Sequence, residues 1–232
     1  MTQQEKPFLG ILEDHKLSKE YQTQHSSVKS SRSCTEKTQS FVPFHQIASA
    51  LVKSTGLRSD GRIDDRSFWI SYVSPLPTPL VIPMVYPRMI SLHDLNSKMD
   101  GSLIPPAIPP SSEHVNDDGI YLLENGMDCL IYIGNSVDPE IMRQLLGISS
   151  FDEIPTQFVL QQYDNPLSKK LNDVINEIRR QRCSYLRLKL CKKGDSSGLL
   201  FLSYMIEDKT PSGLSYVEFL VHIHRQIQTK MS

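Results

Sequence analysis

The most regular hydrophobic pattern of the chain runs from Ile120 to Leu146, where two short apolar runs precede an amphipathic stretch. Asn125-Gly126 separates the two runs, and this residue pair favours the positive φ angles of a tight hairpin turn. Asp138 followed by Pro139 is typical of a helix start, and Gly147 is typical of a helix end. The pattern therefore predicts a strand, a turn, a second strand and a helix.

The C-terminal third continues this alternation. A helix is predicted after Asn165-Pro166 because its apolar residues form one stripe. Strands are predicted over Ser184 to Cys191, which alternates, and over Leu199 to Ile206, which is apolar on both faces and therefore typical of a central strand. Ser215 and Glu218 form a capping-box pattern for a last helix. The residues predicted to be buried in the two helices are Leu167, Leu171, Val174, Ile175 and Ile178, and then Tyr216, Phe219, Leu220, Ile223 and Ile227.

The pattern is weaker before Ile120. Only nine of the first forty residues are apolar, so residues 1 to 40 are predicted to be disordered. Phe44, Ile47 and Leu51 predict a helix that Gly56 stops, and Asp64 is predicted to cap a second helix ahead of three prolines. Val81 to Leu92 is predicted to be a strand interrupted by prolines, and Gln157 to Gln161 a short strand. The segment 104–110 is proline-rich and predicts a rigid connector in preference to a polyproline ligand.

Together these elements predict an α/β fold in which a mixed sheet lies between helices. The predicted organisation is a disordered segment at 1–40, a remnant of a helical domain at 41–78 and one α/β domain at 79–232. The two short helices of the middle part carry aromatic faces and are too small to form a core alone, so we expect them to pack on something larger.

Composition places the chain among ordinary soluble proteins. It has 232 residues, 39% apolar residues and a formal net charge of −1. The charge gives no reason to expect nucleic acid as a partner. No apolar run reaches the length of a membrane-spanning helix, and the N-terminus lacks the apolar core of a secretory signal. We therefore expect a cytosolic protein whose four scattered cysteines are reduced thiols, mostly buried within strands.

Several groups of polar residues were weighed as sites. His222 and His224 lie two apart on a predicted helix, point in different directions and cannot share one metal ion. The acidic pairs Asp117-Asp118 and Glu207-Asp208 lack the spacing of a calcium loop and are predicted to be turn residues. The residues 133–136 lack the lysine of a phosphate-binding loop. Cys183 follows several arginines, but a buried thiol at a strand start is the preferred interpretation. No catalytic, cofactor-binding or metal-binding residue is predicted.

One charge feature remains. Between Asn165 and Lys193 the chain carries only two acidic residues, Asp173 and Glu177, against nine basic ones. Such a segment is either a solvated helix face or a basic surface that meets anionic lipid or an acidic partner, and the first interpretation is preferred. The nine residues, called the basic segment below, are Lys169, Lys170, Arg179, Arg180, Arg182, Arg187, Lys189, Lys192 and Lys193.

Beyond these patterns, several long runs of the chain resemble one protein family. The runs are LVIPMVYPRMISLHDL (80–95), PSSEHVNDDGIYLLENG (110–126), LIYIGNSVDPEI (130–141), PTQFVLQQYDNPLSKKLNDVINEIRRQR (155–182) and SYVEFLVHIHRQIQ (215–228). They resemble the C-terminal part of the cargo-adaptor subunit of the inner COPII vesicle coat, from about Ala50 to Ser232. The resemblance implies the end of a helical domain, with DDRSFWISYVSPL (64–76) as its last helix, followed by a gelsolin-like domain.

The resemblance also has limits. Full-length family members carry a zinc finger, a trunk domain and a β-barrel ahead of this part, and no cysteine pair in this chain matches the zinc site. No zinc, no other cofactor and no cargo-binding residue is therefore carried over. Residues 1 to 40 match nothing in the family. We expect a truncated paralogue, an alternative gene product or a fragment.

The resemblance implies a non-enzymatic coat component that acts in transport from the endoplasmic reticulum to the Golgi, in the cytoplasm and peripherally on the membrane of the endoplasmic reticulum and on COPII vesicles. The implied partners are the GTPase-activating inner-coat subunit and other COPII proteins, with weak contact to acidic membrane and none to nucleic acid. The alternative is a gelsolin-like module that binds actin or calcium, and an enzyme is the least favoured class.

Overall fold

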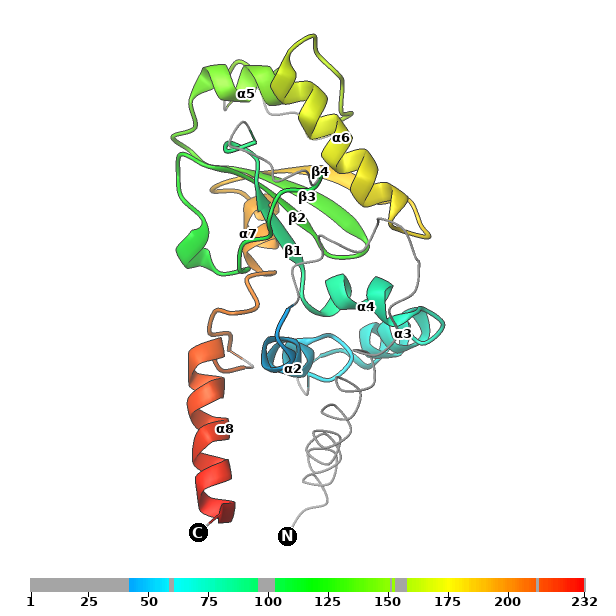
Figure 1. Ribbon diagram of the computed structural model, residues 1–232, viewed down its shortest axis with the longest axis vertical. Helices are drawn as coiled ribbons and strands as arrows, with labels where there is room; N and C mark the ends of the chain where they lie inside the picture. The colour runs from blue at the N-terminus through cyan, green and yellow to red at the C-terminus, as the bar shows by residue number, and fades with distance from the viewer. Residues whose placement is uncertain are drawn as a thin grey trace, which may run out of the picture. The chain divides into compact units, whose positions relative to one another are not determined.

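The computed structural model describes residues 42–58, 61–95, 103–150, 152, 158–211 and 213–231. The predictions for residues 1 to 40, for Cys34 and for Gln157 lie outside the described residues. The described part contains a four-stranded mixed sheet with helices on both faces, which confirms the predicted α/β class (Figure 1). The strands lie in sequence order and are β1 (Arg88–Ser91), β2 (Ile120–Glu124), β3 (Asp128–Ile133) and β4 (Arg187–Lys192).

Strand directions follow from the connections. β1 pairs antiparallel with β2, and β2 pairs antiparallel with β3 through the predicted hairpin. β4 pairs parallel with β3, because the chain crosses one face of the sheet between them. Gly126 has a φ of 84° in the hairpin loop, and the Asn125 side chain accepts hydrogen bonds there from the backbone N–H groups of Met127 and Asp128. The turn is thus closed by the two residues that predicted it.

Two apolar layers fill the space on either side of the sheet. On one face, helices α5 (Pro139–Leu146) and α6 (Pro166–Arg180) cover the strands, as Figure 1 shows. Asp138 and Asn165 accept hydrogen bonds from the first turns of these helices, and Gly147 adopts a left-handed φ of 72° after α5. All five apolar residues predicted to be buried in α6 are buried.

The opposite face corrects one prediction. Leu199 to Ile206 does not form a central strand, because α7 (Ser196–Leu202) is a helix capped by Asp195. Phe201 and Met205 are the fully buried residues of this run, and Phe201 stacks on Tyr132 with ring centroids 4.6 Å apart. A short apolar run is compatible with either a buried strand or a buried helix, and in this segment it forms a helix that lies on the sheet.

The N-terminal part of the described chain consists of short helices. They are α2 (Phe44–Lys53), α3 (Ile63–Val73) and α4 (Thr78–Val85). The prediction of a strand over Val81 to Leu92 is therefore wrong in its first half. Pro79 lies in the first turn of α4, where proline is tolerated, and Pro83 lies inside the helix. Asp64 is not the cap of α3, because the helix begins at Ile63 after Arg62.

The remaining elements surround the sheet. The segment 104–110 forms no helix, and Ile108 within it pairs with Met89 beside β1. A short 3-10 helix, η1 (Ser112–His114), follows it. Residues 158–161 form no strand, contrary to prediction, although Phe158 and Leu160 pack against the core. Helix α8 (Tyr216–Met231) begins with the predicted capping box, in which Ser215 and Glu218 exchange hydrogen bonds of 2.9 and 3.2 Å.

Candidate functional site

The hairpin end of the sheet holds a buried carboxylate. The Glu124 side chain at the end of β2 is fully buried and accepts a hydrogen bond of 2.7 Å from Nη2 of Arg182, which is itself 4% exposed. The backbone N–H of Gly126 donates to the other carboxylate oxygen, and Nε of Arg88 lies 3.9 Å away. Both oxygens are therefore satisfied, and the carboxylate links β1, the hairpin and the segment after α6.

A second carboxylate lies nearby at the start of β3. Asp128 accepts from Nε of Arg187 at 2.9 Å and from Nζ of Lys189 at 3.1 Å, both on the neighbouring strand β4. The two cations lie on the same face of β4 because they are two residues apart. The two basic side chains on this face of β4 thus share the Asp128 carboxylate on β3.

The rest of the basic segment is also engaged within the chain. Lys170 donates to the backbone carbonyl of Leu95 at 3.1 Å, and the Arg179 guanidinium lies 4.8 Å from the centre of the Tyr185 ring. Ion pairs join the other members to acidic side chains, namely Lys169 to Asp164, Arg180 to Glu177, Lys192 to Asp152 and Lys193 to Asp117. Each of the nine basic residues thus has a partner inside the domain, which reduces the charge available to an external anion.

The cysteines divide into two environments. Cys129 on β3 and Cys191 on β4 are buried, and burial raises the pKa of each thiol to about 12. They are therefore uncharged at neutral pH and pack as small apolar side chains. Cys183 is exposed, so the prediction of a buried thiol at a strand start is wrong. It lies four residues before β4 begins at Arg187, outside the sheet.

Glu207 and Asp208 form a junction between distant elements. The Glu207 carboxylate accepts hydrogen bonds from the Tyr86 hydroxyl at 2.6 Å and from the Gln46 amide at 3.0 Å. The Asp208 carboxylate accepts from the Ser111 hydroxyl at 2.6 Å. Lys53 of α2 donates through Nζ to the backbone carbonyl oxygens of residues 206 and 208. These residues are more than turn formers, because they join α2, α4 and η1 to the loop before α8.

The junction shifts the pKa values of its members. Burial lowers the pKa of Lys53 despite the negative charges of Asp208 and Glu207 beside it. Burial by itself would raise the pKa of Asp208, but hydrogen bonds from Ser111 and Ser112 and the charge of Lys53 outweigh it and lower that pKa. Burial and the hydrogen bond to Glu207 raise the pKa of Tyr86. The lowered pKa of Asp208 favours its ionised form, and the raised pKa of Tyr86 favours its neutral, hydrogen-bond-donating form.

The other weighed residues lie in a turn and on α8. Asp117 and Asp118 lie in a turn, as predicted, and the Asp117 carbonyl oxygen accepts from the backbone N–H of Ser136 at 2.8 Å. His222 and His224 are both exposed on α8. Across the described ranges, no group of three or more His, Cys, Asp or Glu side chains is placed to hold a metal ion. In the same ranges no helix is long and apolar enough to span a bilayer.

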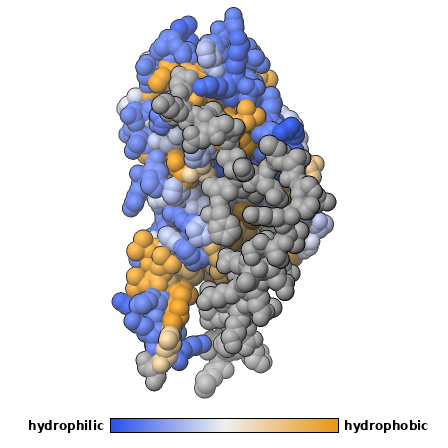
Figure 2. Space-filling model, in the orientation of Figure 1, coloured by the Kyte–Doolittle hydropathy of each residue, from blue (hydrophilic) through white to orange (hydrophobic). Residues whose placement is uncertain are grey.

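The surface that stands out is apolar and lies on the helices outside the sheet domain. Large exposed hydrophobic side chains gather on α2 and α3, where Phe44 is 59%, Ile63 76% and Phe68 61% exposed. Helix α8 also has no fully buried residue, so the prediction that it buries Leu220 and Ile227 is wrong. Figure 2 shows an apolar patch on the lower part of the molecule, where α8 lies. Exposed apolar patches occur where proteins contact other proteins, membranes or ligands.

Sequence reasoning missed both charged networks. Glu124 and Arg182 are 58 residues apart, and Tyr86 and Glu207 are 121 apart, so no local pattern connects them. A signal was nevertheless present in Glu124, a charged residue that ends the apolar run of β2. A charged residue directly before a tight hairpin in an apolar run needs a partner if the strand is central.

The chain resembles a family model and several known proteins. The gelsolin-repeat model matches residues 101–175. The protein transport protein SEC24 C of Arabidopsis thaliana is 69% identical over 184 residues, and SEC24 B of the same plant is 61% identical over 185 residues. The human protein transport protein Sec24C is 36% identical over 171 residues. The crystal structure of the human COPII-coat protein Sec24c matches with a TM-score of 0.71 and 33% identity, over 84% of this chain and 27% of that one.

The matches cover most of this chain and a small part of each relative. The alignments to the two Arabidopsis proteins include 79% of this chain, and the chain spans about 17% of their length. The fold is thus gelsolin-like, with the mixed sheet and flanking helices described above, and the resemblance found in the sequence runs is confirmed.

Proposed function

Because Sec24 proteins are homologues of this chain over 184 residues, we propose that it is a component of the COPII coat. In this role it acts in vesicle-mediated protein transport from the endoplasmic reticulum to the Golgi. The 69% identity over 184 residues carries the proposal. Identity at that level preserves the surface as well as the core, and surfaces determine assembly.

The proposed role is that of a non-enzymatic assembly module. The charged residues of the hairpin end and of the basic segment bind one another, and the described thiols in the sheet are buried. Side chains that are paired or buried within the domain in this way stabilise the fold. The proposal includes no zinc and no cargo pocket, and it retains the division into a helical part at 41–78 and a gelsolin-like part at 79–232.

The proposed partners are the GTPase-activating inner-coat subunit and other COPII coat proteins, on the cytoplasmic face of the endoplasmic reticulum and on coated vesicles. A pull-down from cytosol with the immobilised full chain tests this. We expect the GTPase-activating subunit to be retained, and a gelsolin repeat from an actin-binding protein to retain none. A chain that recovers no coat subunit would show that the assembly role is absent.

Contact with an acidic membrane surface is a second, weaker part of the proposal. Since each residue of the basic segment has an internal partner, little free charge remains, and binding to acidic liposomes should be weak and lost at high salt. Nucleic acid is not a proposed partner. Equal binding to neutral and acidic liposomes would contradict an electrostatic contact.

The alternative of an actin-binding or calcium-binding gelsolin module is not favoured by the comparisons. We expect no cosedimentation with actin filaments and an unchanged melting temperature when calcium is added. A clear calcium-dependent rise in melting temperature would reverse this preference.

A further inference from the structure

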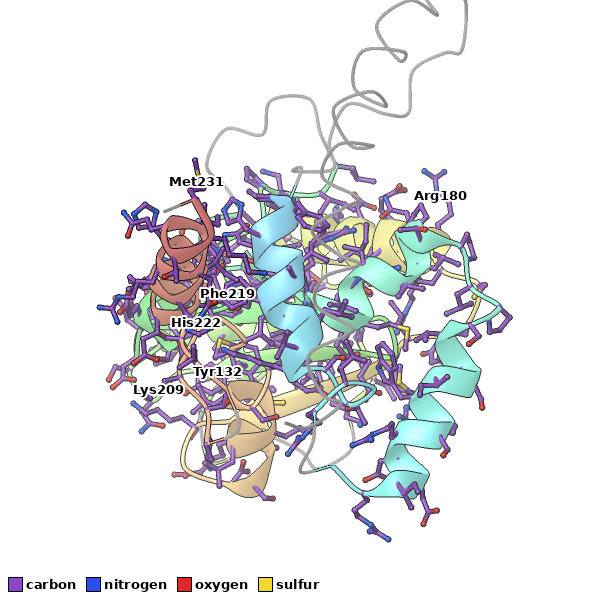
Figure 3. All side chains as sticks on the ribbon, turned by 90° about the horizontal axis from the view of Figure 1, so that it is seen from below. Tyr132, Arg180, Lys209, Phe219, His222 and Met231 are labelled. Carbon is purple, nitrogen blue, oxygen red and sulfur yellow. The ribbon has the colours of Figure 1, made fainter. Side chains whose placement is uncertain are left out.

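Helix α8 is supported by side chains in its first half. Tyr216, Phe219 and Ile223 are half-buried, whereas residues 224–231 are exposed. The Tyr216 ring stacks on His45 of α2 with centroids 5.7 Å apart, and Figure 3 shows Phe219 on the side of α8 nearest α2. A helix of 16 residues is only marginally stable by itself in water. The helical state of α8 therefore depends on the contacts at its start.

The residues 206–208, which we call the strap, precede α8 and are held by several elements. The Ile206 side chain packs against the apolar cluster that α2, α3 and α4 form. The Glu207 carboxylate accepts hydrogen bonds from α2 and from Tyr86 at the end of α4. The Asp208 carboxylate accepts hydrogen bonds from the residues at the start of η1. Each residue of the strap is thus fixed by its own side chain.

The backbone of the strap is fixed as well, by Lys53 at the end of α2. Nζ of Lys53 donates to the carbonyl oxygen of Ile206 at 2.6 Å and to that of Asp208 at 2.7 Å. Hydrogen bonds from an ionised donor are stronger than those between neutral groups. The carbonyl oxygen between them, that of Glu207, accepts from the backbone N–H of Tyr216 at 2.8 Å. Three successive carbonyl groups therefore connect α2 to the first residue of α8.

We propose that Lys53 acts through the strap to hold α8 folded against α2, so that displacing the last turn of α2 releases α8. On its other side the strap follows α7, and Phe201 and Met205 there are buried against the sheet. Opening the strap therefore frees α8 and leaves the sheet in place. Segments with few buried apolar contacts open locally in this way, at a lower free energy than the whole domain. This role of Lys53 is independent of the proposed coat function.

Hydrogen–deuterium exchange of the full chain, resolved by peptide mass spectrometry, tests the proposal. Lys53→Met keeps the length of the side chain and removes the ammonium group. We expect the amides of α8 to exchange at least about tenfold faster in this variant, while those of β2 and β3 keep their rates. Lys209→Met is the matched control, because Lys209 pairs with Glu218 of α8 but is 67% exposed. It should change the exchange of α8 by less than about threefold.

Tyr86→Phe tests the strap without removing a charge. It deletes the hydroxyl group that donates to Glu207 and keeps the buried ring, so we expect a smaller increase that is again confined to the strap and α8. An effect of Lys53→Met alone would retain the role of Lys53 and remove Glu207 from it. Unchanged exchange of α8 in both variants would overturn the proposal and assign its docking to the apolar contact with α2. An equal rise in α8 and in the sheet would also overturn it, because Lys53 would then stabilise the whole domain.

Discussion

Glu124 and Arg182 form an ion pair of 2.7 Å in which the side chains are 0% and 4% exposed. The pair joins the hairpin to the segment after α6, and its carboxylate also receives the N–H of Gly126. Two charges removed from water contribute little net stability as a pair, but a single one left behind is costly. The pair therefore favours the one placement of the hairpin in which Arg182 reaches the Glu124 carboxylate.

Arg182→Met should lower the free energy of unfolding by about 3 kcal/mol, since it leaves the buried Glu124 carboxylate with the Gly126 N–H and the more distant Arg88 as its partners. Urea denaturation measures the change. Arg180→Met is the matched control, because the ion pair of Arg180 with Glu177 is exposed on its arginine side, and it should cost less than about 1 kcal/mol. Adding Glu124→Gln to Arg182→Met should recover part of the loss. Equal effects of the two arginine substitutions would contradict the role of burial.

Asp208→Asn should reduce the loss of melting temperature that the domain shows between neutral and acidic pH. The pKa of Asp208 is lowered in the folded state, so its stabilising contribution is present above the unfolded pKa of about 3.9 and is lost as the pH falls through the folded value. Melting temperatures measured from neutral to acidic pH should therefore converge for wild type and variant at the acidic end. Asp173→Asn, at an exposed position of α6, serves as control. Curves that stay parallel would exclude this contribution.

Local signals in the sequence predicted the hairpin, α5 and α6 correctly. Each carries its own boundary residues, such as Asn125-Gly126, Asp138 and Asn165, whose side chains or backbone make the expected bonds within four residues. The failures are of another kind. Leu199–Ile206 is apolar without a period, and its helix is decided by the cap at Asp195 and by the sheet beneath it. The exposure of α8 depends on what packs around it, which no local pattern records.

Phe201→Ala should lower the free energy of unfolding by about 3 to 5 kcal/mol, because this side chain is fully buried and stacks on Tyr132. Leu200→Ala, one position earlier on the exposed side of α7, should change it by less than about 1 kcal/mol. Chemical denaturation compares the two. This contrast between neighbours is expected for a helix that presents one residue to the sheet, and similar losses at both positions would instead match a strand buried on both faces.

Thiol reactivity should separate Cys183 from the two sheet cysteines. Cys183 is exposed, whereas burial raises the pKa of Cys129 and Cys191 to about 12, so their reactive thiolates are scarce in the folded protein. In a Cys34→Ser background, a disulfide reagent at neutral pH should label one thiol rapidly and two more only after denaturation. Cys183→Ser added to that background should abolish the rapid phase and leave the slow one unchanged. Rapid labelling that persists in the double variant would mean that a sheet thiol is accessible and that β3 or β4 opens readily.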